Sequence, residues 1–123
     1  MTGGSPHVVL IVEHDEFLKS LTADIMQDAG FAVLQASDAD EAVTILESRS
    51  DIALLLTSVI MPGRTDGVGL VHMVCKRWPA VKTVIASGQR RLRGRGLPKD
   101  SRFFLKPYDP QIMISEIRSL LGR

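Results

Sequence analysis

This sequence of 123 residues lacks several features that define whole classes of proteins. It has one cysteine, Cys75, so it forms no internal disulfide and fits a reducing compartment. No apolar stretch is long enough to cross a bilayer, and no charged-then-apolar leader is present, so we expect a cytoplasmic protein without membrane segments. The formal net charge is only +1, which by itself says nothing about nucleic acid.

Apolar residues are plentiful, at 45% of the chain, and they are arranged in short runs. The longest run, residues 52–62, ends in a Pro-Gly turn and is typical of a strand buried on both faces of a parallel sheet. Four other runs are rich in β-forming residues and are bounded by polar or turn residues. The predicted strands are residues 7–12, 31–35, 52–57, 81–86 and 102–105.

Segments of helical periodicity lie between the strands. Asp15, Asp38 and Asp109 stand at N-cap positions, and Glu41 is placed for a capping box from Asp38. Residues 87–100 have no apolar period and support at most a poor or frayed helix. The predicted inner faces are Leu18, Leu21, Ile25 and Ala29; Ala39, Ala42, Val43 and Leu46; Leu70 or Val71 with Val74, Cys75 and Trp78; and Met113, Ile117, Leu120 and Leu121.

Strands that alternate with helices over short connections predict an α/β fold, in which a parallel sheet is covered by helices on both faces. Residues 1–6 are expected to form a flexible tail and residues 7–123 one domain. In such a sheet the residues that follow the first, third, fourth and fifth strands converge on one crevice. These residues are Glu13, His14, Ser58, Ala86, Ser87 and Lys106.

Three motifs carry a resemblance to a known family. They are VLIVE at 9–13, LLLTSVIMPG at 54–63 and FLKPY at 104–108. The layout resembles the receiver domain of two-component response regulators over nearly the whole chain. The resemblance implies a doubly wound, flavodoxin-like five-stranded parallel sheet of order 2-1-3-4-5. It also implies a signalling module, not an enzyme, that receives a phosphoryl group from a histidine kinase on an aspartate ending the third strand.

The resemblance also assigns roles to single positions. Glu13 matches the first of two acidic residues that hold Mg²⁺, and Ile60 lies at a further metal-binding position. Lys106 matches the lysine that contacts the phosphoryl group, and Phe103 the switching aromatic residue. The family's Lys-Pro peptide is often cis, which makes the Lys106–Pro107 bond a candidate.

Three positions depart from the family pattern. His14 replaces the second acidic residue, Ser58 replaces the phosphoacceptor aspartate, and Ala86 replaces the strand-four hydroxyl residue, with Ser87 one position late. A serine hydroxyl is a weak nucleophile unless a base activates it, and Mg²⁺ prefers hard oxygen ligands to imidazole. We therefore expect a pseudo-receiver that takes no aspartyl phosphate and needs no cofactor, with Mg²⁺ binding weak or lost.

Charge counting gives the same expectation. Glu13 and Lys106 cancel each other, so the crevice has little need of a divalent ion. The hypothesis is that Lys106 bonds Glu13 or Ser58 directly and holds the switch surface in one state. The alternative is a phosphorylatable receiver, in which Ser58 is an engineered replacement for aspartate or is itself the modified residue.

The expected partners are a histidine kinase or phosphotransfer protein, or a downstream effector. The sequence leaves open whether the chain also forms a homodimer. One basic cluster is either a solvated loop or a docking patch for an acidic partner. No recognition helix or stacking aromatic accompanies it, so this domain is not expected to bind nucleic acid. The sequence leaves open whether it is a single-domain regulator or part of a longer protein. The basic cluster consists of Arg90, Arg91, Arg93, Arg95 and Lys99.

Overall fold

Five parallel strands form one sheet in the order β2-β1-β3-β4-β5. The computed structural model describes residues 6–88 and 96–122. The predicted strand order is confirmed, and every strand boundary lies within one residue of its prediction. The strands are β1 (Val8–Val12), β2 (Ala32–Ala36), β3 (Ile52–Ser58), β4 (Lys82–Ser87) and β5 (Arg102–Leu105).

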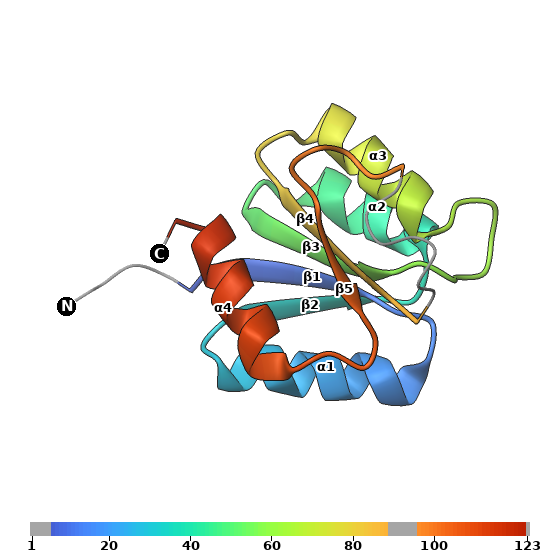
Figure 1. Cartoon of the computed structure of the whole chain (residues 1–123). Helices are drawn as coiled ribbons and strands as arrows, with labels where there is room; N and C mark the ends of the chain where they lie inside the picture. The colour runs from blue at the N-terminus through green and yellow to red at the C-terminus, as the bar shows by residue number, and fades with distance from the viewer. Residues whose placement is uncertain (1–5, 89–95, 123) are drawn as a thin grey trace.

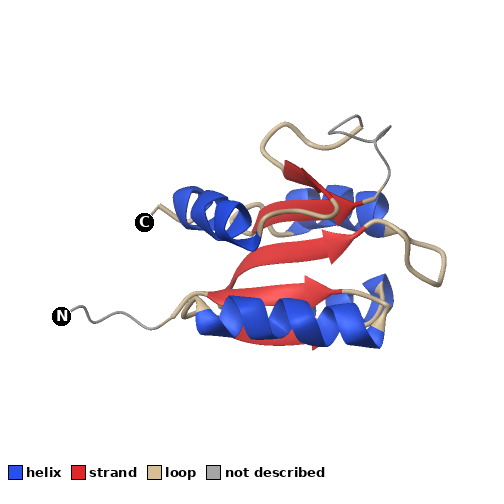
Figure 2. Ribbon diagram, turned by 60° about the horizontal axis from the view of Figure 1, so that its bottom comes forward, coloured by secondary structure: helices blue, strands red, loops and turns tan. Residues whose placement is uncertain are grey.

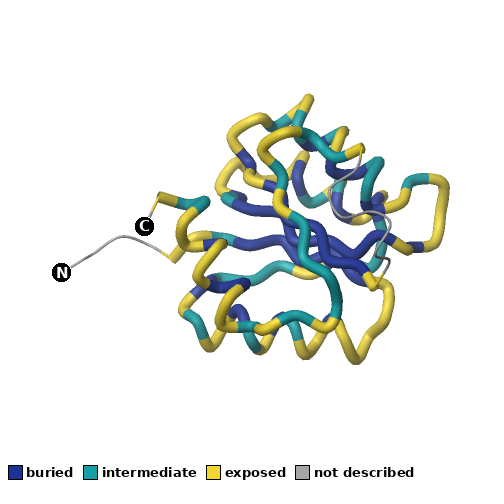
Figure 3. Tube along the Cα trace, viewed as in Figure 1, coloured by how far each residue is buried: buried dark blue, intermediate teal, exposed yellow. Residues whose placement is uncertain are grey.

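Helices cover both faces of the sheet, as predicted (Figures 1 and 2). Helices α1 (Glu16–Asp28) and α4 (Pro110–Leu120) lie on one face. Helices α2 (Ala39–Ser48) and α3 (Gly67–Arg77) lie on the other. Each face has its own apolar core, and the central strands between them are buried (Figure 3). No helix in residues 6–88 or 96–122 is long and apolar enough to span a membrane.

Strand β3 shows why the central apolar run is continuous. Successive side chains of a strand point to opposite faces. Leu54 and Leu56 accordingly pack with the α1 and α4 core, and Leu55 packs with the α2 and α3 core. Both faces are therefore apolar up to Leu56, and the polar residues Thr57 and Ser58 end the strand at the crevice.

The predicted caps are present. Asp15, Asp38 and Asp109 each accept a backbone N–H from the first turn of α1, α2 and α4 respectively. The capping box needs one correction. The Glu41 carboxylate accepts the backbone N–H of Ser37, at 2.7 Å, instead of that of Asp38.

The predicted inner face of α1 is half right: Ile25 and Ala29 pack against the core, but Leu18 and Leu21 do not belong to the buried face. Leu18 and Leu21 are 37% and 45% exposed, whereas Lys19, Ala23 and Met26 are buried. The buried set has the i, i+4, i+7 spacing of one helix face. Lys19 can lie on this face because its ammonium group donates to Ser37 Oγ at 2.6 Å, so that only its aliphatic stem is left in apolar surroundings.

The other three inner faces follow the prediction more closely. Helix α2 buries Ala39, Ala42 and Leu46, and α3 buries Leu70, Val71 and Val74. Helix α4 buries Ile114 in addition to the expected Met113 and Ile117. The remaining predicted residues of these faces are partly buried and pack against the two cores: Val43, Cys75, Trp78, Leu120 and Leu121.

Two predictions fall largely outside the described residues. The poor helix at 87–100 includes residues 89–95, and the described remainder of that segment contains no helix. Residues 1–5 of the predicted tail are likewise not described.

The corrected face of α1 predicts a difference between two truncations. Met26→Ala should lower the free energy of unfolding by about 2–5 kcal/mol, because it opens a cavity in the core. Leu18→Ala should cost less than half as much, since its side chain is partly solvated. Urea denaturation of both variants measures the two losses, and equal losses would contradict the assigned face.

Candidate functional site

The register of the sheet places the polar residues of the crevice in one row. Val12 pairs with Thr57, so Glu13 follows β1 beside Ser58. Ser58 in turn pairs with Ala86 on β4. Beyond β5, the backbone N–H of Lys106 donates to the carbonyl of Ser87 at 2.8 Å. Backbone pairing thus brings together residues that lie far apart in the sequence.

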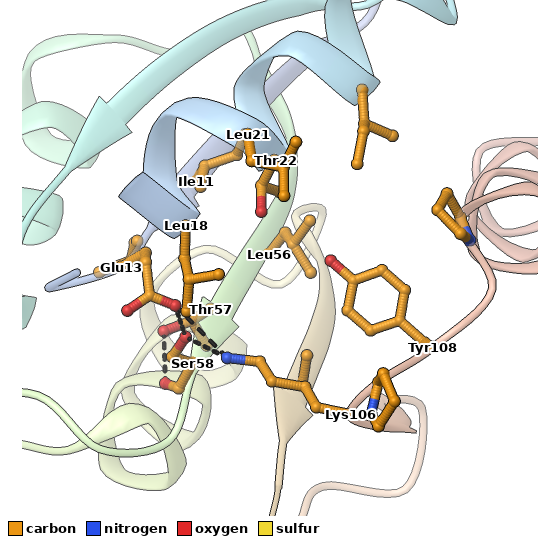
Figure 4. Close-up of a pocket in the computed structure, with 15 residues that line it drawn as sticks. Ile11, Glu13, Leu18, Leu21, Thr22, Leu56, Thr57, Ser58, Lys106 and Tyr108 are labelled. Carbon is orange, nitrogen blue, oxygen red and sulfur yellow. Dashed lines mark hydrogen bonds and ion pairs between the residues drawn. The ribbon is translucent and has the colours of Figure 1, made fainter. Parts of the chain in front are cut away.

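The side chains of three of these residues contact one another (Figure 4). The Ser58 hydroxyl donates a hydrogen bond to Glu13 Oε1. Lys106 Nζ lies 3.3 Å from Ser58 Oγ and 3.4 Å from Glu13 Oε1. The direct contact predicted for Lys106 is therefore confirmed. We call Glu13, Ser58 and Lys106 the polar triad.

Burial makes the polar triad energetically significant. Glu13 and Ser58 are only 9% and 8% exposed, and Lys106 is half-buried. A carboxylate removed from water needs hydrogen bonds or an opposite charge. Glu13 has both, because its Oε2 also accepts the backbone N–H of Asp15 at 3.0 Å.

A glycine that the sequence analysis did not single out holds the loop after β3 close to Ser58. The backbone N–H of Gly67 donates to the Val59 carbonyl at 2.7 Å. A Cβ atom at position 67 would lie 1.8 Å from the Ser58 carbonyl oxygen, so only glycine fits. No local motif could have signalled this approach, because it depends on how α3 starts against the end of β3.

The remaining predicted positions are dispersed. His14 is exposed, Ile60 is 70% exposed, and neither lines the cavity beside Glu13 and Ser58. Phe103 is partly buried against the α2 and α3 core. The Lys106–Pro107 peptide is cis, as the resemblance suggested. In the basic cluster only Lys99 is described, and it is exposed; Arg90, Arg91, Arg93 and Arg95 lie outside the described residues.

A cavity of about 370 Å³ opens beside the polar triad, between α1 and the connection from β5 to α4. Its floor includes Ile11 and Leu56 from the buried strands (Figure 4). Sequence reasoning missed this cavity because it assigned the lining residues of α1 to the core. The lining residues from α1 are Leu18, Leu21, Thr22 and Ile25, and those after β5 are Lys106, Pro107, Tyr108 and Pro110.

Comparison with known proteins identifies the family of this fold and crevice. Residues 9–118 match the response regulator receiver domain family. The chain belongs to this family. The match spans all five strands and nearly all of the last helix, so the receiver assignment covers the whole sheet and its crevice.

Relatives of this chain include longer proteins. Protein PetR of Rhodobacter capsulatus is 31% identical over 125 residues, which is 100% of this chain and 52% of PetR. An NtrX-like putative response regulator of Rickettsia bellii is 31% identical over 80 residues, which is 65% of this chain and 17% of that protein. The chain therefore spans about half of PetR, and a smaller share of the second relative.

Solved structures support the same fold. A chain in the crystal structure of the CheX–CheY–BeF₃–Mg complex from Borrelia burgdorferi superposes with a TM-score of 0.85 at 24% identity. The match covers 98% of this chain and 92% of that chain. At this level of identity the likeness establishes the fold alone.

Receiver domains bind Mg²⁺ at this crevice, so the donor set of this chain can be compared with that ion's needs. Mg²⁺ takes an octahedron of oxygen ligands, usually with one or two carboxylates. Here Glu13 is the acidic side chain of the crevice, and its oxygens already accept from Ser58, Lys106 and Asp15. No group of three or more His, Cys, Asp or Glu side chains suited to a metal exists within residues 6–88 and 96–122. A Mg²⁺ ion at this crevice would therefore have to compete with Lys106 and Ser58 for the Glu13 carboxylate.

The polar triad predicts a coupling between Glu13 and Lys106. Lys106→Met should lower the free energy of unfolding by about 1–3 kcal/mol, because the buried Glu13 carboxylate loses its cation. The double variant Glu13→Gln/Lys106→Met should lose less than the sum of the two single changes. Urea denaturation provides all four free energies.

Lys99→Met is the matched control for this cycle, because Lys99 is exposed. Its cost should stay within about 0.5 kcal/mol. A Lys106→Met loss no larger than the Lys99→Met loss would show that the ion pair contributes nothing to stability.

Proposed function

We propose that this receiver is a signalling module that acts through protein–protein contact and does not undergo ordinary aspartyl phosphorylation. The proposal rests on the position and the contacts of Ser58. It stands at the carboxyl end of β3, with its hydroxyl bonded to Glu13 and within reach of Lys106. No carboxylate is available at that position to form an acyl phosphate.

The chemistry of position 58 supports the proposal. An aspartate attacks phosphorus as an anion, whereas a serine hydroxyl must lose a proton to become an effective nucleophile. The polar triad also leaves the crevice electrically balanced, since the charges of Glu13 and Lys106 offset one another. A divalent cation would have to displace Lys106 from Glu13 and would gain only one carboxylate. Weak or absent Mg²⁺ binding follows from this balance.

The balanced crevice also suggests how the module works. Lys106 is held at Glu13 and Ser58 without a phosphoryl group, so the surface around β4 and β5 stays in one state. Recognition then depends on the presence of the domain and not on its modification. Receivers act through contacts with other proteins, and one solved structure holds CheY of Borrelia burgdorferi in a complex with CheX. We propose a kinase, a phosphotransfer protein or an effector as the partner of this chain.

One contact favours a second candidate function, in which Ser58 itself is modified. The Ser58 hydroxyl donates to a carboxylate, and this pairing of a hydroxyl with a base activates serine nucleophiles elsewhere. Lys106 lies where it could stabilise negative charge on an incoming phosphoryl group. His14, the other base considered, is exposed and does not line this cavity. An engineered serine in place of aspartate would give the same starting geometry.

Intact-mass analysis after incubation with acetyl phosphate and Mg²⁺ separates the two functions. The chain should show no added phosphoryl mass under the proposed function, because position 58 has no carboxylate. A stable adduct that is abolished by Ser58→Ala would instead establish the second candidate.

The positive control restores the family residues. The triple variant His14→Asp/Ser58→Asp/Ala86→Thr should become phosphorylated in a Mg²⁺-dependent way, because it regains the acceptor, the acidic pair and the hydroxyl. If the triple variant is folded but stays unmodified, the three departures are not the reason for inactivity.

A Mg²⁺ titration tests the electrostatic part of the proposal separately. Amide NMR shifts of Ser58 and Ala86 should not change saturably with Mg²⁺, either alone or with beryllofluoride, because Lys106 already neutralises Glu13. The triple variant should show saturable shifts under the same conditions. Saturable shifts in the unmodified chain would refute the expected loss of Mg²⁺ binding.

A further inference from the structure

The cavity beside the polar triad has apolar walls that stay partly exposed among residues 6–88 and 96–122. Leu18, Leu21 and Ile25 lie along one side of α1 and line it, and Leu18 and Leu21 stay 37% and 45% exposed. The strand residues Ile11 and Leu56 form its floor. Exposed apolar surface costs roughly 25 cal/mol per Å², so a molecule that covers these walls gains binding free energy.

Two hydroxyl groups at the cavity surface can form hydrogen bonds with a bound ligand. Thr22 and Tyr108 both line the cavity, and Figure 4 shows the Tyr108 hydroxyl directed toward α1. Neither hydroxyl forms a hydrogen bond with another residue in the described part of the chain. The edge contact between the rings of Tyr108 and Phe104, with centroids 6.3 Å apart, holds the Tyr108 ring at the cavity wall.

The charge of the cavity determines which ligands suit it. Its charged lining residues are Glu13 and Lys106, and they form an ion pair with each other. An anionic ligand would add an uncompensated charge beside the buried Glu13 carboxylate, and a cationic ligand would add one beside Lys106. Burying an unpaired charge is costly, so a neutral molecule is favoured.

We propose that this cavity is a binding site for a compact, uncharged and mainly apolar small molecule that carries at least one hydrogen-bonding group. The volume of about 370 Å³ falls within the range of small-molecule sites, and apolar walls with a few polar groups are their usual composition. The apolar body packs between α1 and the floor of the sheet. The polar group bonds Thr22 or Tyr108. Binding of this molecule does not depend on the proposed loss of phosphorylation.

A small molecule fits this cavity better than a second copy of the chain does. The floor at Ile11 and Leu56 is 1% and 4% exposed, so it lies below the surrounding surface. A second copy of the chain would have to insert a projecting side chain to reach it. A small molecule reaches the floor without such a requirement.

Two fluorescent probes with the same ring skeleton test the proposal. N-phenyl-1-naphthylamine is neutral, and 8-anilinonaphthalene-1-sulfonate adds a sulfonate. Titrated into the folded chain without Mg²⁺ or a phosphoryl donor, the neutral probe should bind saturably at one site. The sulfonate probe should bind at least about tenfold more weakly, which is about 1.4 kcal/mol. Amide NMR shifts should concentrate at Leu21, Thr22, Ala86 and Tyr108.

Matched variants on α1 assign the site. Leu21→Glu places a carboxylate in the wall and should weaken the neutral probe at least about tenfold. Phe17→Glu makes the same change on the same helix at a residue that is 73% exposed and does not line the cavity, so binding should change less than about twofold. Both positions are solvent-accessible, and NMR spectra of the variants verify that each one folds.

Several results would overturn the proposal. Non-saturating binding, or equal effects of the two variants, would show adsorption to exposed apolar surface. Equal affinity for both probes would disprove the preference for a neutral ligand. A dimer in analytical ultracentrifugation that Leu21→Glu dissociates would show that a second copy covers the cavity. The acetyl phosphate experiment is independent of all four results, so failure of this proposal and failure of the proposed function are distinguishable.

Discussion

The buried carboxylate of Glu13 constrains the rest of the crevice. It ends β1 at 9% exposure, where an isolated charge would be costly, and it is satisfied by Ser58, Lys106 and the Asp15 backbone together. Those partners come from β3, from the segment after β5 and from the start of α1. The parallel register sets the position of Ser58, so a slip of β3 by one residue against β1 would turn its side chain to the other face of the sheet.

The same interaction links both proposals. While Lys106 contacts Glu13, an incoming phosphoryl group would have to compete with that carboxylate for the lysine, and Mg²⁺ would have to compete with the lysine for the carboxylate. When the two charges cancel, the adjoining cavity behaves as a neutral apolar space with a few hydroxyls at its edge. Phosphoryl transfer needs Lys106 to contact the phosphoryl group, whereas a neutral cavity needs Lys106 to stay paired with Glu13. The contacts of Lys106 in this structure favour the neutral cavity.

The sequence predicted the sheet well and the crevice in part. Alternating apolar runs and caps are local signals, so the strands and the helix starts at Asp15, Asp38 and Asp109 were accessible without coordinates. The contact of Lys106 with Glu13 was also predictable, because opposite charges were placed at converging strand ends. The close approach at Gly67 and the cavity were not, because each depends on how separate elements pack.

Helix α1 is turned about its axis relative to the orientation that its apolar periodicity predicts, and the buried polar residue Lys19 accounts for the difference. Leucines at 18 and 21 and an isoleucine at 25 form an obvious apolar stripe, yet the helix buries Lys19, Ala23 and Met26. Adjacent residues on a helix lie about 100° apart, so turning Lys19 inward necessarily carries Leu18 toward the gap beside α4. Lys19 is tied to the loop after β2 through Ser37, and Ala23 leaves room for close packing on the sheet. The leucines of this stripe are thereby left at the wall of the cavity, next to the polar triad, where the described residues leave them partly exposed and a bound molecule would cover them.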